Sequence, residues 1–519
     1  MKKLIKYLLY ILPACLMLSY HPVMRLGESE SMYFELSVPL LWLVVFDVVA
    51  VLMMVRQRKI FVDLKKWWMW LLFPVWVGVS ILWSLNVVRG ILTAGVLVLL
   101  YIAGYGIWRL RGLLDKEFWR VWWKWFIGSA IVACMWCVVQ CVLDIIGVSQ
   151  DISLMCDGCT YHMFGFPHPN GWAIEPQFMG NLLLAPVLVL VSVIVRKQIG
   201  RNNSERKPSR GVVLTTGQSD SARYFSTGSS SVPVVKTTTG SGFLGSELFL
   251  SFCLFAITTT LFLTFSRGAI YALVVGLVVM TALVWKKRIY LKRMGMIWGI
   301  IGLAFVLALN LQGIMAAVSP TNDTYTSGVT KVLNHLTLGV IDVREGKTEQ
   351  SVEPHVEKSA KKSVEKPVEN SVEKTGEEPV FDGYVAESTD TRLRLSGAAI
   401  KVWSGDLATA MFGVGLGGAG QALYVNNLSP APKEIVQNQY TSLLLETGVV
   451  GVSLLILTMV LVAKTIGKSK NKVLVISLII SYMVTLCFFS GLPNALHIYL
   501  LPAVLALPCV DGRIRKVKE

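Results

Sequence analysis

The sequence predicts an all-α integral membrane protein with about twelve transmembrane helices and one large extracytoplasmic loop between the ninth and the tenth. Hydrophobic residues make up 54% of the chain and charged residues only 16%. Apolar runs recur along it, each long enough to cross a hydrocarbon core of about 30 Å as a helix. Lys and Arg collect in alternate loops between these runs. Because backbone groups in lipid must find partners within the protein, we expect helices rather than isolated strands.

The first apolar run follows two lysines, as in a signal peptide, but it lacks a small-residue cleavage site and more spans follow, so we expect it to be retained. Only a short break separates the seventh run from the eighth, so counts of eleven or thirteen are compatible with the pattern. The twelve runs lie at 4–20, 36–55, 67–85, 90–108, 125–146, 178–195, 247–265, 268–285, 295–312, 447–463, 473–490 and 494–509.

The net charge of +16 does not indicate a nucleic-acid partner, because it follows the loops. Residues 313–445 hold 12 Lys and Arg against 16 Asp and Glu, so the basic excess lies elsewhere. The positive-inside rule places both termini and the basic loops in the cytoplasm. These basic segments are 2–3, 56–66, 109–111, 196–210, 286–288, 468–472 and 513–518.

The domain organisation follows from the spans. Residues 1–195 contain helices one to six with an outward loop at 147–177, and 196–246 form a flexible cytoplasmic loop rich in Ser, Thr and Gly. Helices seven to nine occupy 247–312, the extracytoplasmic loop 313–445, and the last three helices with a cytoplasmic tail 446–519.

Two parts of the extracytoplasmic loop differ in character. SVE recurs three times within 345–385, and this mixed-charge tract with few aromatic residues predicts disorder. After it, Leu395, Ala399, Trp403 and Leu407 recur every four residues and predict one amphipathic helix.

Three arginines are the strongest candidates for chemistry. Arg267 stands at the outer junction of the seventh and eighth spans, where a charge usually faces a cavity or a partner; the alternative is an arginine that snorkels to the interface. Arg392 and Arg394 begin the amphipathic helix. Guanidinium groups bind diphosphate in bidentate fashion, whereas the alternative is a pair of solvated loop arginines beside an acidic tract.

Cys156 and Cys159 form a C-x-x-C pair in the outward loop, close to His162 and His168. A zinc site is conceivable, but a local disulfide or two free thiols fits an extracytoplasmic loop better. The sequence shows no Asp-rich metal motif on this side. We therefore expect neither a metal nor a cofactor.

The order of several motifs resembles the O-antigen ligase and polymerase superfamily of bacterial membrane glycosyltransferases. The motifs are FGFPHPNGWA at 164–173, SRGA at 266–269, an arginine-led helix followed by FGVGLG at 392–417, and QNQYTSLLLETGVVG at 437–451. Many members have His-Asn where this chain has Gln437 and Asn438, and a glutamine cannot serve as a base. The family often has a tryptophan four residues after its motif arginine, where Ser396 follows Arg392. Either Arg392 or Arg394 therefore corresponds to that arginine.

The resemblance implies attack of an acceptor hydroxyl on a glycan carried by a polyprenyl diphosphate, at the outer face of the bacterial plasma (inner) membrane. The partners would be this donor, a glycan, lipid or protein acceptor, and membrane lipids. The implied catalytic residues are Arg267, Arg392 and Gln437. The implied substrate-binding residues are Arg394, Ser266, Asn438, His168 and Asn170. Because the missing histidine leaves the base unassigned, His162, His168 and Glu175 are alternatives.

Other functions remain open from the sequence. Twelve spans with both termini in the cytoplasm also suit a flippase for lipid-linked oligosaccharide or another secondary transporter. Such proteins tend to show internal repeats, and none is seen in this sequence. A scaffold or sensor acting through 196–246 is a third reading, but that loop resembles no protein-binding or nucleotide-binding motif. Polymerase and ligase use the same donor, and the missing histidine slightly favours the polymerase.

Overall fold

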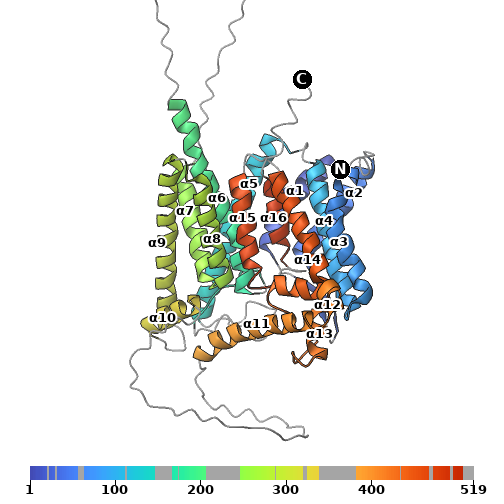
Figure 1. Cartoon of the computed structure of the whole chain (residues 1–519). Helices are drawn as coiled ribbons and strands as arrows, with labels where there is room; N and C mark the ends of the chain where they lie inside the picture. Colours follow the sequence, from blue (N-terminus) through green and yellow to red (C-terminus); the bar gives the residue numbers. More distant parts are fainter. Residues whose placement is uncertain are drawn as a thin grey trace, which may run out of the picture.

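The structure is a computed structural model in which the helices stand side by side as one bundle (Figure 1). It describes residues 1–19, 23–29, 32–56, 64–110, 114–146, 166–173, 175–205, 246–286, 288–318, 324–337, 381–432, 434–466, 472–490 and 495–506.

A helix coincides with each of the twelve predicted apolar runs. They are α1 (Lys2–Met17), α2 (Val38–Arg56), α3 (Leu64–Ser80), α4 (Val87–Leu110), α5 (Lys116–Ile145), α6 (Pro176–Glu205), α7 (Glu247–Leu263), α8 (Arg267–Val284), α9 (Arg288–Val318), α14 (Gln439–Ile466), α15 (Lys472–Thr485) and α16 (Leu496–Ala506). A 3₁₀ turn, η1 (Ile81–Trp83), follows α3. The helical membrane fold is thus confirmed, while the number of spans stays a prediction.

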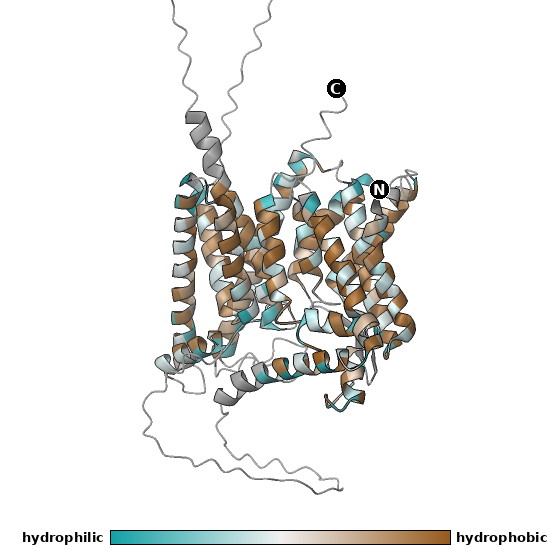
Figure 2. Cartoon of the chain, viewed as in Figure 1, coloured by the Kyte–Doolittle hydropathy of each residue, from teal (hydrophilic) through white to brown (hydrophobic). Residues whose placement is uncertain are grey.

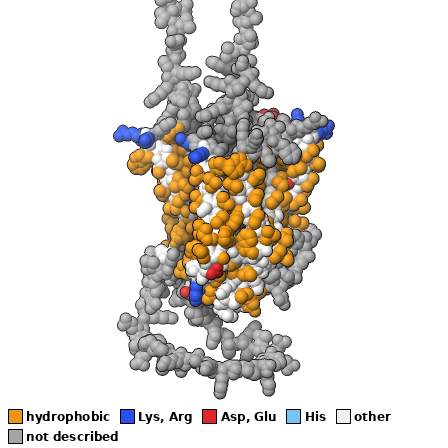
Figure 3. Space-filling view, turned by 45° about the vertical axis from the view of Figure 1, so that its right-hand side comes forward, with side chains coloured by type: hydrophobic (Ala, Val, Ile, Leu, Met, Phe, Trp, Pro, Cys, Tyr) orange, Lys and Arg blue, Asp and Glu red, His pale blue; other side chains and the backbone are white. Residues whose placement is uncertain are grey.

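The bundle has the surface of a membrane protein. Among the described residues, seven helices are long and apolar enough to cross a membrane. Figure 2 shows apolar residues along the whole length of the bundle, and Figure 3 shows hydrophobic side chains covering its flank, with most of the visible Lys and Arg at one end. Outward-facing residues such as Leu52, Val278 and Leu303 are more than half exposed, as lipid-facing positions are.

Four shorter helices gather at the end of the bundle opposite the start of α1 (Figure 1). They are α10 (Tyr325–Leu336), α11 (Phe381–Trp403), α12 (Leu407–Phe412) and α13 (Ala419–Val425). All four belong to the predicted extracytoplasmic loop, so this loop and the N-terminus lie at opposite ends. Which end faces the cytoplasm remains a prediction from the charge pattern.

Three expectations need correction. β1 (Val23–Ser29) and β2 (Met32–Ser37) pair as antiparallel strands, which the predicted fold class does not include. α11 starts at Phe381, so the end of the tract predicted to be disordered is helical, while 345–380 lies outside the described residues. The predicted apolar stripe is also shorter: α11 ends at Trp403, and Leu407 opens α12 with 79% of its surface exposed.

The glycine-rich turn after α12 joins distant parts of the chain. Gly413, Gly415 and Gly417 have φ values of 76°, 86° and 79°, a region that favours glycine. The amide of Val414 donates to the carbonyl of Leu445 at 2.9 Å.

The same turn also contacts the junction of α3 and α4. The Ser84 hydroxyl donates to the carbonyl of Leu416 at 2.7 Å, and the Leu416 amide donates to Ser80 Oγ at 3.3 Å. Opposite the turn, α14 is kinked at Gly448, with φ 63° and ψ −173°. FGVGLG is therefore a packing joint between helices, and it fixes where α11 and α14 meet the bundle.

Replacement of Gly415 by alanine tests this joint. A Cβ there would lie 2.3 Å from the Ser84 Cα, in a backbone conformation that alanine disfavours. We expect destabilisation by about 3 kcal/mol or more, measured as thermal unfolding of the detergent-solubilised protein. The matched control is Gly397→Ala in α11, where a Cβ meets nothing within 4 Å; it should stabilise by about 0.5–1 kcal/mol. Equal melting temperatures for the two variants would refute the claim that this turn depends on close packing at Gly415.

Candidate functional site

The turn between α7 and α8 places Arg267 inside the protein. Ser266 caps α8, with its Oγ accepting from the Ala269 amide at 3.2 Å. Arg267 is the first residue of the helix and is only 6% exposed. A Cβ on Gly180 of α6 would lie 2.8 Å from Thr264 Oγ1 and 2.9 Å from Ser266 Cβ. This close packing holds the turn within the bundle, so the arginine is buried and does not snorkel to an exposed interface.

Arg392 reaches the bundle from α11. Its Nη1 donates to the carbonyl of Phe488 at 3.2 Å, and its Nη2 donates to Gln177 Oε1 at 3.4 Å. Gln177 Nε2 donates to the same Phe488 carbonyl at 3.2 Å. The Phe488 side chain packs over Gly268, where a Cβ would lie 3.1 Å from the Phe488 Cβ and 3.3 Å from its ring. Segment 486–490, which follows α15, thus connects the guanidinium of Arg392 with the turn that carries Arg267.

The segment 166–173 forms another wall of this region. Gln140 of α5 holds it through three hydrogen bonds: Nε2 donates to Asn170 Oδ1 at 3.0 Å and to the Gly171 carbonyl at 3.1 Å, and Oε1 accepts from the Gly171 amide at 2.8 Å. His168 and Asn170 are both buried. Asn170 therefore has an anchoring role here.

His335 of α10 completes the cluster. Its Nε2 lies 3.2 Å from the carbonyl oxygen of Phe265. The Phe265 ring contacts the rings of both His168 and His335, with centroid distances of 6.5 and 5.2 Å. Burial lowers the pKa of His335 well below its ordinary value, and the positive charges of Arg267, His168 and Arg392 lower it further. These four side chains therefore share one electrostatic environment.

Sequence reasoning missed His335, although a signal was present. Gly328, Val332 and His335 are the buried residues of α10 and fall at i, i+4 and i+7, the spacing of one helical face. A histidine on the apolar face of a short helix is a candidate for a buried polar role.

Glu175 adds one acidic group to the region. Burial raises the pKa of its carboxyl, while the nearby Arg392 guanidinium lowers it. The residue directly precedes Pro176, the first residue of α6, and its backbone carbonyl accepts from the Phe178 amide at 3.0 Å. It was weighed from the sequence as a base, and the structure places it beside one of the two arginines.

Gln437 and Asn438 precede α14. Asn438 caps the helix, because its Oδ1 accepts from the amides of Tyr440 and Thr441 at 3.0 and 3.3 Å. The next residue, Gln439, donates its amide to the Leu486 carbonyl at 3.0 Å and accepts from Ser490 Oγ at 3.2 Å. The motif is therefore fixed to segment 486–490, the same segment that receives Arg392.

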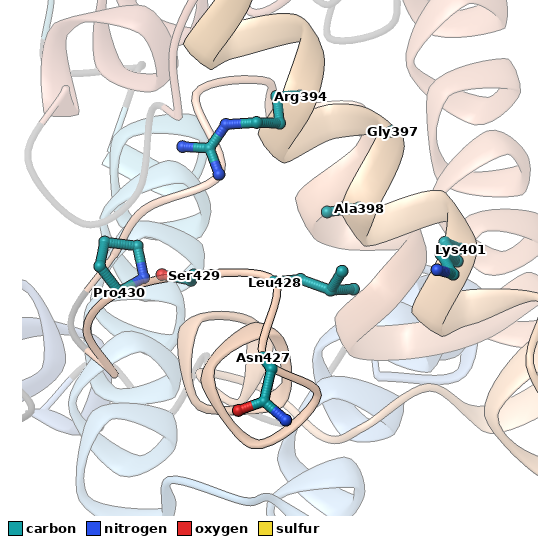
Figure 4. Close-up of a pocket in the computed structure, with 8 residues that line it drawn as sticks. All are labelled: Arg394, Gly397, Ala398, Lys401, Asn427, Leu428, Ser429 and Pro430. Atoms are coloured by element: carbon teal, nitrogen blue, oxygen red, sulfur yellow. The ribbon is translucent and has the colours of Figure 1, made fainter. Parts of the chain in front are cut away.

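Arg394 does not accompany Arg392. It is exposed and lines an open cavity of about 740 Å³ between α11 and the loop after α13 (Figure 4). In Figure 4 its guanidinium points toward Ser429 and Pro430. The lining residues are Arg394, Gly397, Ala398, Lys401, Asn427, Leu428, Ser429 and Pro430. Two arginines that are two positions apart on a helix thus serve different surfaces.

The described residues contain no group of three or more His, Cys, Asp or Glu side chains placed to hold a metal ion. Cys156, Cys159 and His162 lie outside the described residues. The site as described consists of the buried Arg267 and the partly buried Arg392, two histidines, one glutamate and the amides of Gln177 and Gln140. Such a set is suited to binding an anion and to moving a proton.

Comparison with known proteins gives one match. The family model described as O-antigen ligase matches residues 252–456, and no curated protein matches the chain. The matched range includes the turn with Arg267, α10, α11, the glycine-rich turn and the start of α14. Segments 166–173 and 486–490 lie outside it.

Arg267 and Arg392 together predict diphosphate binding. Inorganic pyrophosphate should raise the melting temperature of the purified protein, and Arg392→Gln should weaken its binding about tenfold or more, because a charge-assisted bidentate contact is lost. The charge-matched control is Arg120→Gln, an exposed arginine paired with Glu117 on α5, which should leave binding unchanged. Equal loss of binding in both variants would indicate that only net charge matters.

Proposed function

We propose that this chain, whose residues 252–456 match the O-antigen ligase family model, is a glycosyltransferase that polymerises or ligates polyprenyl-diphosphate-linked glycan. The match supports a bacterial multi-pass membrane enzyme with a lipid-linked glycan substrate and an acceptor. The outer-face location, the polyprenyl diphosphate carrier and the cytoplasmic termini are the finer parts of the proposal. They are supported by the charge pattern of the loops and by α10–α13 lying opposite the start of α1.

The observation that carries the proposal is the pair of arginines, the buried Arg267 and the partly buried Arg392, both of which act on the charge of His335. When the bond between the sugar and the diphosphate breaks, negative charge develops on the leaving oxygen. Preorganised cations in a site shielded from water stabilise such charge strongly. The network of Gln177 and the Phe488 carbonyl holds Arg392 in place before the donor arrives, so little reorganisation is needed during the reaction.

We assign the remaining predicted residues to binding of the acceptor and of the sugars around the reacting bond. Gln437 and Asn438 would orient the acceptor hydroxyl through their amides, which can donate and accept hydrogen bonds but cannot take a proton. His168 and Asn170, held by Gln140, would contact the sugars next to the bond that breaks. Ser266 retains its hydroxyl hydrogen for a substrate oxygen while its lone pair caps α8. No step of this mechanism requires a metal.

The cavity at Arg394 lies on the other side of α11 and is large enough for several sugar units, since ligand sites commonly measure about 300–1,000 Å³. Its apolar floor of Ala398 and Leu428 and its cations Arg394 and Lys401 suit a glycan that carries acidic groups. We assign to it the part of the glycan that extends away from the reaction centre.

The reaction is tested with purified protein in lipid and a polyprenyl-diphosphate-linked oligosaccharide. We expect release of lipid diphosphate together with a lengthened or transferred glycan. Arg267→Ala should lower the rate by about 10²–10³-fold, the usual effect of removing one stabilising group from a developing charge. Arg120→Gln, far from the site, should keep the rate of the unmodified protein.

A transporter would give a different result. Donor would move across the bilayer of a proteoliposome without any release of lipid diphosphate, with acceptors present and the protein folded. Full activity of a folded Arg267→Ala variant would contradict the assignment of Arg267 to the reaction centre, even if the protein proves to be a transferase.

The Arg394 cavity is tested by the double variant Arg394→Gln, Lys401→Gln. If the cavity holds the distal part of an acidic glycan, KM should rise about tenfold while kcat stays within about twofold, because the contact is equal in the ground state and the transition state. An unchanged KM would exclude the cavity from glycan binding.

A further inference from the structure

The attack of a hydroxyl releases a proton, and Gln437 cannot accept it. We propose that His335, which α10 contributes to the site, accepts the proton of the acceptor hydroxyl. The inference rests on the proposed function. The acceptor oxygen forms a bond to the anomeric carbon, the bond from that carbon to the diphosphate oxygen breaks, the diphosphate leaves with the electron pair, and the hydroxyl proton moves to the imidazole.

The hydrogen bond to Phe265 fixes the tautomer of His335. A backbone carbonyl can only accept, so Nε2, at 3.2 Å from the Phe265 oxygen, carries the hydrogen. In the neutral ring Nδ1 then holds the lone pair. The ring is also fixed by its position against Phe265, with 5.2 Å between the ring centroids. One nitrogen therefore anchors the ring, and the other has the electron pair that a base needs.

The charges around His335 make this base dependent on the donor. Arg267, Arg392 and His168 keep the ring neutral in the empty site, in addition to the effect of burial. A neutral ring is the form that can accept a proton, but the two guanidinium charges oppose its protonation. The diphosphate of the donor offsets these charges. His335 thus gains basicity when the donor is bound, which couples proton transfer to the presence of the leaving group.

The groups facing His335 come from several elements. Arg267 lies on α8, Arg392 on α11 and His168 on segment 166–173, and all three act on its charge. Tyr271 of α8 donates its hydroxyl to the carbonyl of the neighbouring Leu336. From α9, Gln312 packs against α10 through its backbone oxygen near Gly328 and does not titrate.

Two alternatives are less suited to the role. Glu175 is coupled to Arg392, and a carboxylate beside the guanidinium would compete with the diphosphate for it. His168 belongs to the segment that Gln140 fixes to α5, and its ring centroid lies 6.5 Å from that of Phe265, farther than the 5.2 Å of His335.

The first test separates proton transfer from packing. In His335→Gln the side-chain amide keeps a donor for the Phe265 carbonyl and lacks a base, so the fold should be retained. We expect the transfer rate to fall about 100-fold or more, with pyrophosphate affinity within about twofold and with the acidic limb of the pH–rate profile lost. Near-normal transfer by a folded His335→Gln variant would overturn the proposal. The proposal would also be overturned if the acidic limb of the pH–rate profile were lost in His168→Gln and kept in His335→Gln.

The second test needs no turnover and so distinguishes failure of this inference from failure of the proposed function. The chain has six histidines, and ¹⁵N-histidine NMR with His335→Gln identifies the resonance of His335. We expect a neutral ring with hydrogen on Nε2 at pH 6, and an upward shift of its titration when inorganic pyrophosphate binds. A ring that is already charged at pH 6 without pyrophosphate, or a titration that pyrophosphate leaves unchanged, would overturn the proposal.

Discussion

The architecture of the site depends on two guanidinium groups at one end of a helical membrane bundle, one buried (Arg267) and one partly buried (Arg392). A buried charge is costly unless hydrogen bonds and counter-charges compensate it. Here the Phe488 carbonyl and Gln177 compensate Arg392, and this requirement brings α11, the start of α6 and the segment after α15 together. The surface helix α11 is thus tied to the bundle at the point where the chemistry is proposed.

The same constraint explains the polar shell around the cations. Burial and the nearby guanidinium groups lower the pKa of His335, while Glu175 gives partial compensation. A site of this kind is preorganised for an anion, which the proposed donor would supply. The glycine-rich joint at 413–417 serves the site indirectly, because it fixes α11 relative to the kink in α14.

The sequence predicted the helical membrane fold, because runs of about 20 apolar residues have few other solutions. It also singled out Arg267 and Arg392, because charges at such positions are rare and costly. It did not separate Arg392 from Arg394, since their different surroundings arise from contacts with Phe488 and with the loop after α13, far along the chain. His335 was overlooked for a similar reason: its neighbours come from α8, α11 and segment 166–173. The antiparallel pair of β1 and β2 lacked a strong turn signal, and pairing between short strands depends on context.

The most direct measurement is a cryo-EM structure of the protein in lipid with a polyprenyl diphosphate bound. The account predicts that the phosphate oxygens lie within hydrogen-bond distance of the guanidinium groups of both Arg267 and Arg392, on the side of α11 that faces the bundle. Diphosphate density in the Arg394 cavity, or at any place that neither Arg267 nor Arg392 reaches, would contradict the account.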